Sequence, residues 1–122
     1  MLNPRVRAAA EAVLPGFLLR ALDPFEARVR HEVERFAASL LPGARVLDAG
    51  AGELRYAAAF ASHRYVALDL AVGDTAWDYS KLDLLGDLEH LPLADAAFDA
   101  SVNIVTLEHV RRPSRCWTSW LA

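Results

Sequence analysis

The sequence has little of what marks several common protein classes. Its 122 residues include a single cysteine, Cys116, which cannot form an internal disulfide and so fits a reducing compartment. No run approaches the roughly 18 apolar residues of a membrane span, and the amino end lacks the basic, apolar and small-residue order of a signal peptide. We therefore expect a soluble cytoplasmic protein that has no membrane partner.

Basic faces and metal or hydrolase motifs are also missing. The formal net charge is -3, and the short cluster of Arg111, Arg112 and Arg115 fits a solvated helix start better than a nucleic-acid site. The histidines and the cysteine have no metal-ligand spacing, and neither Glu-His pair completes H-E-x-x-H. A G-x-S-x-G elbow is absent as well. We expect no bound metal, no nucleic-acid partner and no serine-hydrolase chemistry.

What is present suffices for one domain preceded by helices. With 54% hydrophobic and 24% charged residues, a chain of this length can build one core but not two. Residues 1–43 predict a helical segment that begins with a short helix over 5–14, and Pro15-Gly16 breaks that helix. Residues 44–122 are expected to form the domain itself.

A second helix has a clear start signal. Asp23 is placed as its N-cap, Pro24 as its first residue, and Glu26 completes a capping box. Pro42-Gly43 should end it. The apolar residues that recur at three- and four-residue steps and predict its buried stripe are Phe25, Val29, Val33, Phe36 and Leu40.

The rest of the chain is organised around RVLDAGAGE, residues 45–53. Val46 and Leu47 indicate a buried strand, and Asp48 lies near its carboxyl end. Gly50 and Gly52 allow a tight turn and a close approach of the backbone to a ligand, and the small residues over 54–61 predict a helix after the turn. Because ligands of open parallel sheets bind outside the carboxyl ends of the strands, this stretch predicts a nucleotide-type site.

The charge of this turn argues against a dinucleotide. In the pattern G-x-G-x-x-G laid on Gly50, the third glycine position is Arg55, and Glu53 stands where a pyrophosphate would bind. An acidic group there repels a phosphate but tolerates a ligand with a cationic centre. An NAD-dependent oxidoreductase is therefore a disfavoured alternative.

The motifs together resemble one family. VLDAGAGE resembles motif I of the class I S-adenosylmethionine-dependent methyltransferases, of the type 11-like kind. LLGDLEHLP over 84–92, followed by FDASV over 98–102, resembles that family's third strand, loop and fourth strand, and LEHV over 107–110 resembles its next helix start. The resemblance implies an α/β fold, a Rossmann-like doubly wound parallel sheet in the order 3-2-1-4, with S-adenosyl-L-methionine as cofactor.

Eight residues are candidates for cofactor binding. Asp69 ends the strand over 65–70 about 20 residues after the turn, where an acid commonly accepts the ribose hydroxyls. The resemblance further implies that Asp87 accepts the adenine amine, with the backbone of Leu88 against the ring. Asp48, Gly50, Gly52 and Asn103 are candidates for the methionine end of the cofactor, and Leu70 is a further cofactor-binding candidate.

Three further residues stay open. His109 is a weak candidate for a catalytic base, because a histidine at a helix start bonds locally about as often. Residues 71–83 are barely long enough for a crossover, so we expect a shortened helix or an irregular loop. Within it, Trp77 and Tyr79 either cover the adenine or pin the loop to the sheet, and the second use is the more common.

The last segments predict an incomplete sheet. The strand over 100–105 is apolar on both faces, as a central parallel strand should be, yet it would lie at an open edge. We expect that the chain is the truncated or frameshifted N-terminal half of the family domain, or that a partner supplies the other half. The open edge would also permit self-association.

Two functional classes follow. The first is an enzyme that transfers a methyl group from S-adenosylmethionine to a small-molecule acceptor, which the sequence does not identify. The second is a cofactor-binding remnant without catalysis. Both predict cofactor binding, and only the first predicts turnover.

Overall fold

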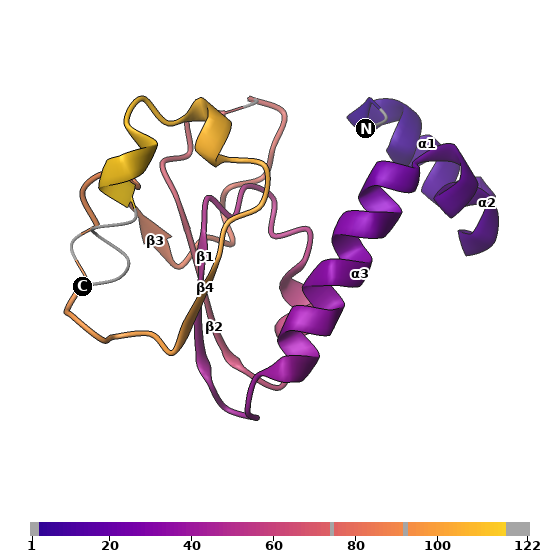
Figure 1. Cartoon of the computed structure of the whole chain (residues 1–122). Coiled ribbons are helices and arrows are strands. Elements are labelled where there is room, and N and C mark those ends of the chain that lie inside the picture. The colour runs from indigo at the N-terminus through magenta and orange to yellow at the C-terminus, as the bar shows by residue number, and fades with distance from the viewer. Residues whose placement is uncertain (1–2, 74, 92, 117–122) are drawn as a thin grey trace. The chain divides into compact units, whose positions relative to one another are not determined.

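The chain divides into two compact units, Met1–Ser39 and Leu40–Ala122 (Figure 1). The structure is a computed structural model that describes residues 3–73, 75–91 and 93–116. The first unit is helical, and the second is built on a sheet. No helix in the described ranges is long and apolar enough to cross a membrane.

The helical unit begins with two short helices. α1 (Pro4–Val13) is capped by Asn3, whose side chain accepts a hydrogen bond from the backbone of Arg5 at 3.0 Å. The break that Pro15-Gly16 predicted is present. A further helix, α2 (Gly16–Leu22), follows it and was not predicted; it starts where the Pro15 carbonyl accepts the first intrahelical hydrogen bonds.

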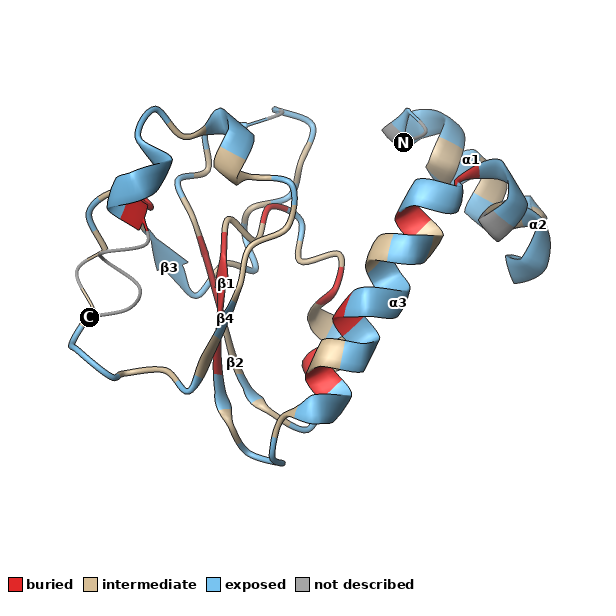
Figure 2. Cartoon of the chain, viewed as in Figure 1, coloured by how far each residue is buried: buried red, intermediate tan, exposed pale blue. Residues whose placement is uncertain are grey.

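The helix start predicted at Asp23 is confirmed. α3 (Pro24–Ser39) begins directly after Asp23, whose Oδ1 accepts the Glu26 N–H at 3.1 Å. Val33 is buried on one side of the helix, but Phe25 is 50% exposed, so its place in the buried stripe was wrong (Figure 2). The reason is electrostatic, because Glu26 takes the buried position at that end of the helix and lies against Arg7.

A buried ionic cluster holds the ends of these helices together. The Arg7 guanidinium of α1 forms an ion pair with Asp23 and lies 3.7 Å from the Glu26 carboxylate. Arg30 lies 3.2 Å from the same carboxylate, one turn further along α3. Asp23 and Glu26 are only 5% and 4% exposed. Buried carboxylates are stable when cations face them, so this cluster fixes the packing of α1 against the start of α3.

The second unit is an all-parallel sheet of four strands in the order β3-β2-β1-β4. Its members are β1 (Arg45–Ala49), β2 (Arg64–Asp69), β3 (Leu84–Leu85) and β4 (Ala100–Val102). This order confirms the predicted α/β, doubly wound fold class. β2 and β3 are added on one side of β1 and β4 on the other, so the strand order reverses between β1 and β4. The loops that leave these two strands therefore flank the switch point where open α/β sheets bind ligands.

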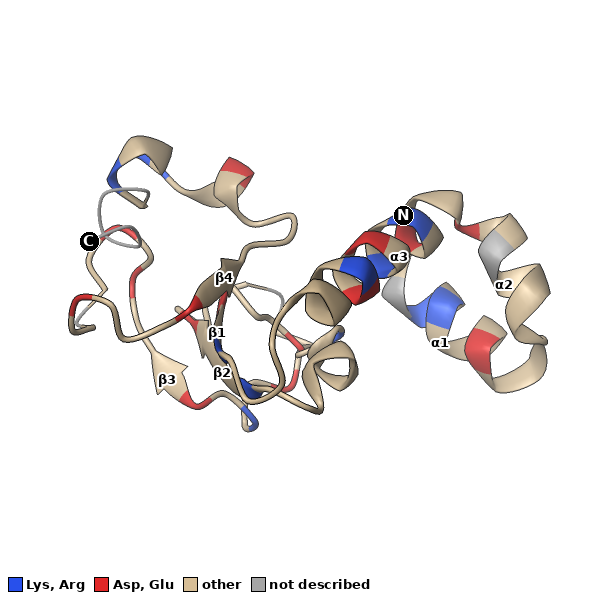
Figure 3. Ribbon diagram, turned by 60° about the horizontal axis from the view of Figure 1, so that its bottom comes forward, with Lys and Arg blue, Asp and Glu red and all other residues tan. Residues whose placement is uncertain are grey.

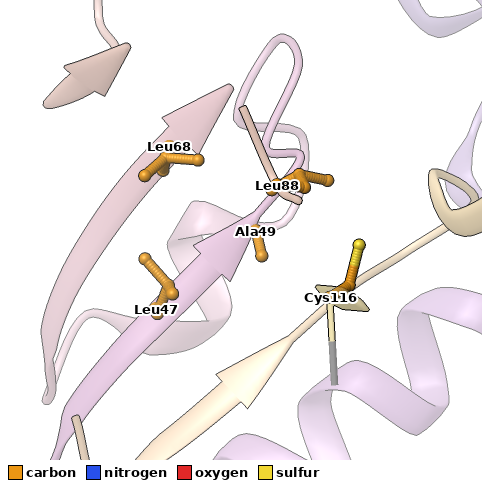
Figure 4. Packing of buried hydrophobic residues seen from close by; sticks show 5 residues of the cluster. All are labelled: Leu47, Ala49, Leu68, Leu88 and Cys116. Carbon is orange, nitrogen blue, oxygen red and sulfur yellow. The ribbon is translucent and has the colours of Figure 1, made fainter. Parts of the chain in front are cut away.

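The two faces of β1 bury different residues. Leu47 and Ala49 point to one face, where they form a buried apolar cluster with Leu68, Leu88 and Cys116 (Figure 4). Alternation along the strand places Asp48 on the opposite face. The cluster thus supports the strand ends from one side, while an acidic group is buried on the other.

Two segments after the strands differ from prediction. A helix was expected over 54–61, but the chain forms turns and then a short 3-10 helix, η1 (Ala57–Phe60). Leu54 has φ +59°, a left-handed conformation that a helix cannot include. β4 is three residues long instead of the six expected over 100–105, and Val105 with φ +54° has already left the strand.

Candidate functional site

The turn after β1 is a closed network of backbone hydrogen bonds. Gly50 and Gly52 have φ of +91° and +53°, which only glycine adopts readily. The N–H groups of Gly50 and Ala51 donate to the Leu68 carbonyl at 2.8 and 3.0 Å, and the Gly52 N–H donates to Asp69 Oδ2 at 2.9 Å. Three successive N–H groups of the turn therefore have acceptors within the protein, and none of them is left to bind a phosphate.

Asp69 joins the end of β2 to this turn. Besides Gly52, its carboxylate accepts the Ala71 N–H at Oδ1, at 2.8 Å. Each oxygen of an ionised carboxylate can accept two hydrogen bonds, so each keeps capacity for a ligand hydroxyl. The residue is partly exposed. Its neighbour Leu70 is 50% exposed at the same strand end.

Asp48 lies in β1, two residues before Gly50, and is 3% exposed. The Tyr65 hydroxyl donates a hydrogen bond to Asp48 Oδ2, and the Tyr65 ring stacks on Phe60 at 5.4 Å between centroids. Burial raises the pKa of Asp48 to about 6, the Tyr65 hydrogen bond opposes this rise, and the charge of Asp69 adds to it. The structure therefore brings Asp69 to the glycine turn and holds Asp48 within one face of the sheet.

Asp87 follows β3 at the same edge of the sheet as Asp69. The Gly86 N–H donates to the Asp69 main-chain carbonyl at 3.1 Å, which places Asp87 one residue beyond that contact. The Asp87 carboxylate is exposed, and the Glu89 N–H that donates to it at 2.9 Å lowers its pKa. Leu88 turns inward and is 6% exposed within the apolar cluster, so its backbone alone can meet a ligand.

On the other side of the turn, the loop after β4 supplies two side chains. Asn103 Nδ2 donates to the Ala49 carbonyl, and Thr106 Oγ1 donates to the Gly50 carbonyl at 3.2 Å. Sequence reasoning named Asn103 but missed Thr106, which no motif marks. His109 ends the 3-10 helix η2 (Leu107–His109) and is exposed.

Comparisons with known proteins identify the family and agree with the fold. The family model described as a methyltransferase domain matches residues 47–121. This chain belongs to the methyltransferase domain family. A crystal structure from Anabaena variabilis ATCC 29413, described as "Putative methyltransferase from antibiotic biosynthesis pathway", has the same fold, with 20% identity and a TM-score of 0.61. The match covers 77% of this chain and 40% of that one. No curated protein matches the chain.

In this methyltransferase domain, Trp77 packs directly against the glycine turn. A Cβ atom added to Gly52 would lie 3.2 Å from the Trp77 ring, and one added to Gly73 would lie 3.3 Å from it. Tyr79 lies beside Trp77, with 6.2 Å between ring centroids. The irregular loop expected over 71–83 is present in its described residues, and Trp77 pins it to the turn.

The charges near the strand ends are mostly acidic. Figure 3 shows acidic residues along the loops that surround the strands of the methyltransferase domain. Glu53 lies 3.9 Å from Arg55, so the one basic group on the turn faces an acid. Within 3–73, 75–91 and 93–116, no group of three His, Cys, Asp or Glu side chains is placed to hold a metal ion.

Proposed function

We propose that this chain binds S-adenosyl-L-methionine at the glycine turn and takes part in methyl transfer to a small-molecule acceptor. The observation that carries the proposal is the hydrogen bond from the Gly52 N–H to Asp69, which joins the glycine turn to the acid at the end of β2. The turn and this acid lie at the carboxyl edge of a parallel sheet, where such folds bind ligands. Family membership supports the same reading.

The residues fit the chemistry of the cofactor. Asp69 offers acceptors to the two ribose hydroxyls, and the exposed Asp87 offers acceptors to an exocyclic amine, which can only donate. Gly50 and Gly52 allow the left-handed backbone of the turn, and Thr106 and Trp77 lie where their side chains would be. When bound, the cofactor supplies an activated methyl group on a sulfonium. The protein then has to bind the cofactor and the acceptor, orient them and exclude water. The transfer itself requires no metal.

The same turn disfavours a dinucleotide. Pyrophosphates are bound by free N–H groups at a helix start, but here the N–H groups of Gly50, Ala51 and Gly52 already donate within the protein. The four residues that follow Gly52 form turns before η1 begins, so no long helix starts at the site. These observations favour the adenosyl sulfonium over NAD.

Whether this chain completes a turnover is a separate question. It spans 40% of the length of the solved structure that it matches. A cofactor-binding remnant stays the alternative to an active enzyme, and His109 stays a weak candidate for a base.

Isothermal titration with S-adenosylhomocysteine, S-adenosylmethionine and NADH tests the proposal. We expect S-adenosylhomocysteine and S-adenosylmethionine each to bind with a stoichiometry of one, and NADH to give no heat of binding. Binding of NADH alone would contradict the proposal. An assay of S-adenosylhomocysteine release with a panel of small nucleophiles then separates an active enzyme from a remnant, because a remnant binds without release.

A further inference from the structure

We infer that Thr106 and Asn103 are positioning residues that fix the peptide planes of the glycine turn from the β4 side. The inference rests on the proposed function, because it says how the cofactor-binding turn is held in shape. It adds Thr106, which the sequence motifs do not mark, and it gives Asn103 a contact with the turn itself.

Two consecutive peptide planes carry the argument. The plane between Ala49 and Gly50 is held at its carbonyl by Asn103 Nδ2 and at its N–H by the Leu68 carbonyl, at 2.8 Å. The plane between Gly50 and Ala51 is held at its carbonyl by Thr106 Oγ1, at 3.2 Å, and at its N–H by the same Leu68 carbonyl, at 3.0 Å. Each plane is therefore fixed at both ends, between the loop after β4 and the end of β2.

This arrangement matters because glycine has little conformational preference of its own. Gly50 at φ +91° can reach many other conformations, so the turn needs external contacts to stay in one. Side-chain donors on its carbonyls supply them. A turn that is already ordered binds its ligand without the entropic cost of ordering it.

Thr106 also closes the space beside Gly50. A Cβ atom added to Gly50 would lie 2.4 Å from Thr106 Cγ2 and 2.7 Å from Oγ1. Thr106 therefore occupies the space that a side chain at position 50 would need. The sequence suggested that Gly50 is a glycine so that a ligand can approach, but its contact with Thr106 also requires a glycine there.

The position of Thr106 links the turn to the next segment. Thr106 immediately precedes η2, and its carbonyl accepts the His109 N–H at 2.9 Å. The Thr106 hydroxyl has a second acceptor, the Ile104 carbonyl at 3.1 Å, and one proton to donate. A change in the loop around 104–109 can therefore release the Gly50 carbonyl and loosen the turn.

Paired variants of the full chain test the inference. Thr106→Val keeps the branched shape and removes the donor, whereas Thr106→Ser keeps the donor. Thr75→Val makes the same chemical change at an exposed position and serves as control. The readouts are amide hydrogen exchange at Gly50 and Ala51, and titration with S-adenosylhomocysteine.

We expect T106V to accelerate exchange of these two amides and to weaken S-adenosylhomocysteine binding, each by about five-fold, as for one lost hydrogen bond. T106S and T75V should stay within about two-fold of wild type. Faster exchange with unchanged affinity would overturn the positioning role, and so would an effect of T106S as large as that of T106V. If the wild-type chain binds no S-adenosylhomocysteine, the proposed function fails. In that case the exchange measurement still tests the positioning role of Thr106, which unchanged exchange of Gly50 and Ala51 in T106V would overturn.

Discussion

The helical unit and the sheet unit bury acidic side chains against different partners. In the helical unit, Asp23 and Glu26 face the Arg7 guanidinium. In the sheet unit, Asp48 accepts a hydrogen bond from the Tyr65 phenol, and burial raises its pKa. A charged partner stabilises the ionised form, whereas a phenol only partly offsets desolvation.

The two units also differ in what holds them together. The helical unit leaves Val13 and Phe17 80% and 70% exposed and depends on its ionic cluster. The sheet unit has the apolar cluster around Leu47 and Leu68, together with the hydrogen bonds of the glycine turn. The comparison teaches that side-chain charges decide packing in the first unit, whereas backbone geometry at one turn decides the site in the second.

A series of glycine variants separates the two units most sharply. Gly50→Ala should lower the free energy of unfolding by about 4 kcal/mol, because it combines a left-handed φ with the Thr106 contact. Gly43 has φ +78° and open space around it, so Gly43→Ala should cost about 1–2 kcal/mol from backbone strain alone. Gly16→Ala in α2 meets nothing within 4 Å and should be neutral or slightly stabilising. Chemical denaturation measures all three, and equal losses for G16A and G50A would refute the contrast.

Removing the central cation should damage the helical unit alone. Arg7→Ala leaves two buried carboxylates without that partner, so we expect a loss of about 3 kcal/mol. Arg35→Ala breaks an exposed pair with Glu32 at 3.1 Å and should cost under about 0.5 kcal/mol. Amide exchange in α1 and α3 is the measurement. An R7A chain with unchanged exchange in the helices would show that the ionic cluster contributes little.

The buried acid of the sheet should make stability depend on pH. Because the pKa of Asp48 rises from 3.8 to about 6 on folding, the folded chain binds this proton more tightly, and stability falls as pH rises between those values. Asp48→Asn abolishes the effect. The stability of D48N relative to wild type should therefore increase by about 2–3 kcal/mol from pH 4 to pH 7.

Asp99→Asn provides a control of opposite sign for that experiment. The Arg45 guanidinium lowers the pKa of Asp99 to about 2, so its contribution is present above about pH 4 and is lost as pH falls towards 2. Denaturation at several pH values compares the two variants. A D48N curve parallel to that of wild type would mean that Asp48 is not desolvated as the structure indicates.

Charge removal at the turn should have the smallest effect on folding and a clear one on binding. Asp69→Asn keeps one acceptor oxygen but loses the charge and one of two backbone contacts. We expect cofactor affinity to fall by about 1.5–2 kcal/mol. Asp78→Asn is the matched control, since Asp78 is an exposed acid that also accepts a backbone N–H, that of Ser80 at 2.9 Å. Equal affinity of D69N and D78N would exclude Asp69 from the site.

The sequence predicted those features that depend on local patterns. The cap at Asp23 and the strands that contain Leu47 and Leu68 are confirmed, because capping and apolar patterns are properties of neighbouring residues. The sheet order is also confirmed, but it was implied by the family resemblance and not by local patterns. The site residues Gly50 and Asp69 were found from their spacing, and the structure brings them into one hydrogen-bonded turn.

Features that depend on distant partners could not be predicted. Thr106 meets Gly50 across 56 positions of sequence, and Tyr65 reaches Asp48 because of the register between β1 and β2. The predicted helix over 54–61 was wrong because Leu54 adopts a left-handed conformation, which its residue type disfavours. Burial of Glu26 in place of Phe25 likewise required knowing where Arg7 lies.

The measurement that tests the central claim most directly is a titration of the isotope-labelled chain with S-adenosylhomocysteine, followed by backbone amide chemical shifts. Binding at the glycine turn predicts that the largest shifts occur at Gly50, Gly52 and Ala71, whose amides lie at the tips of β1 and β2. Shifts confined to α1–α3, or no shifts at saturating ligand, would contradict the account.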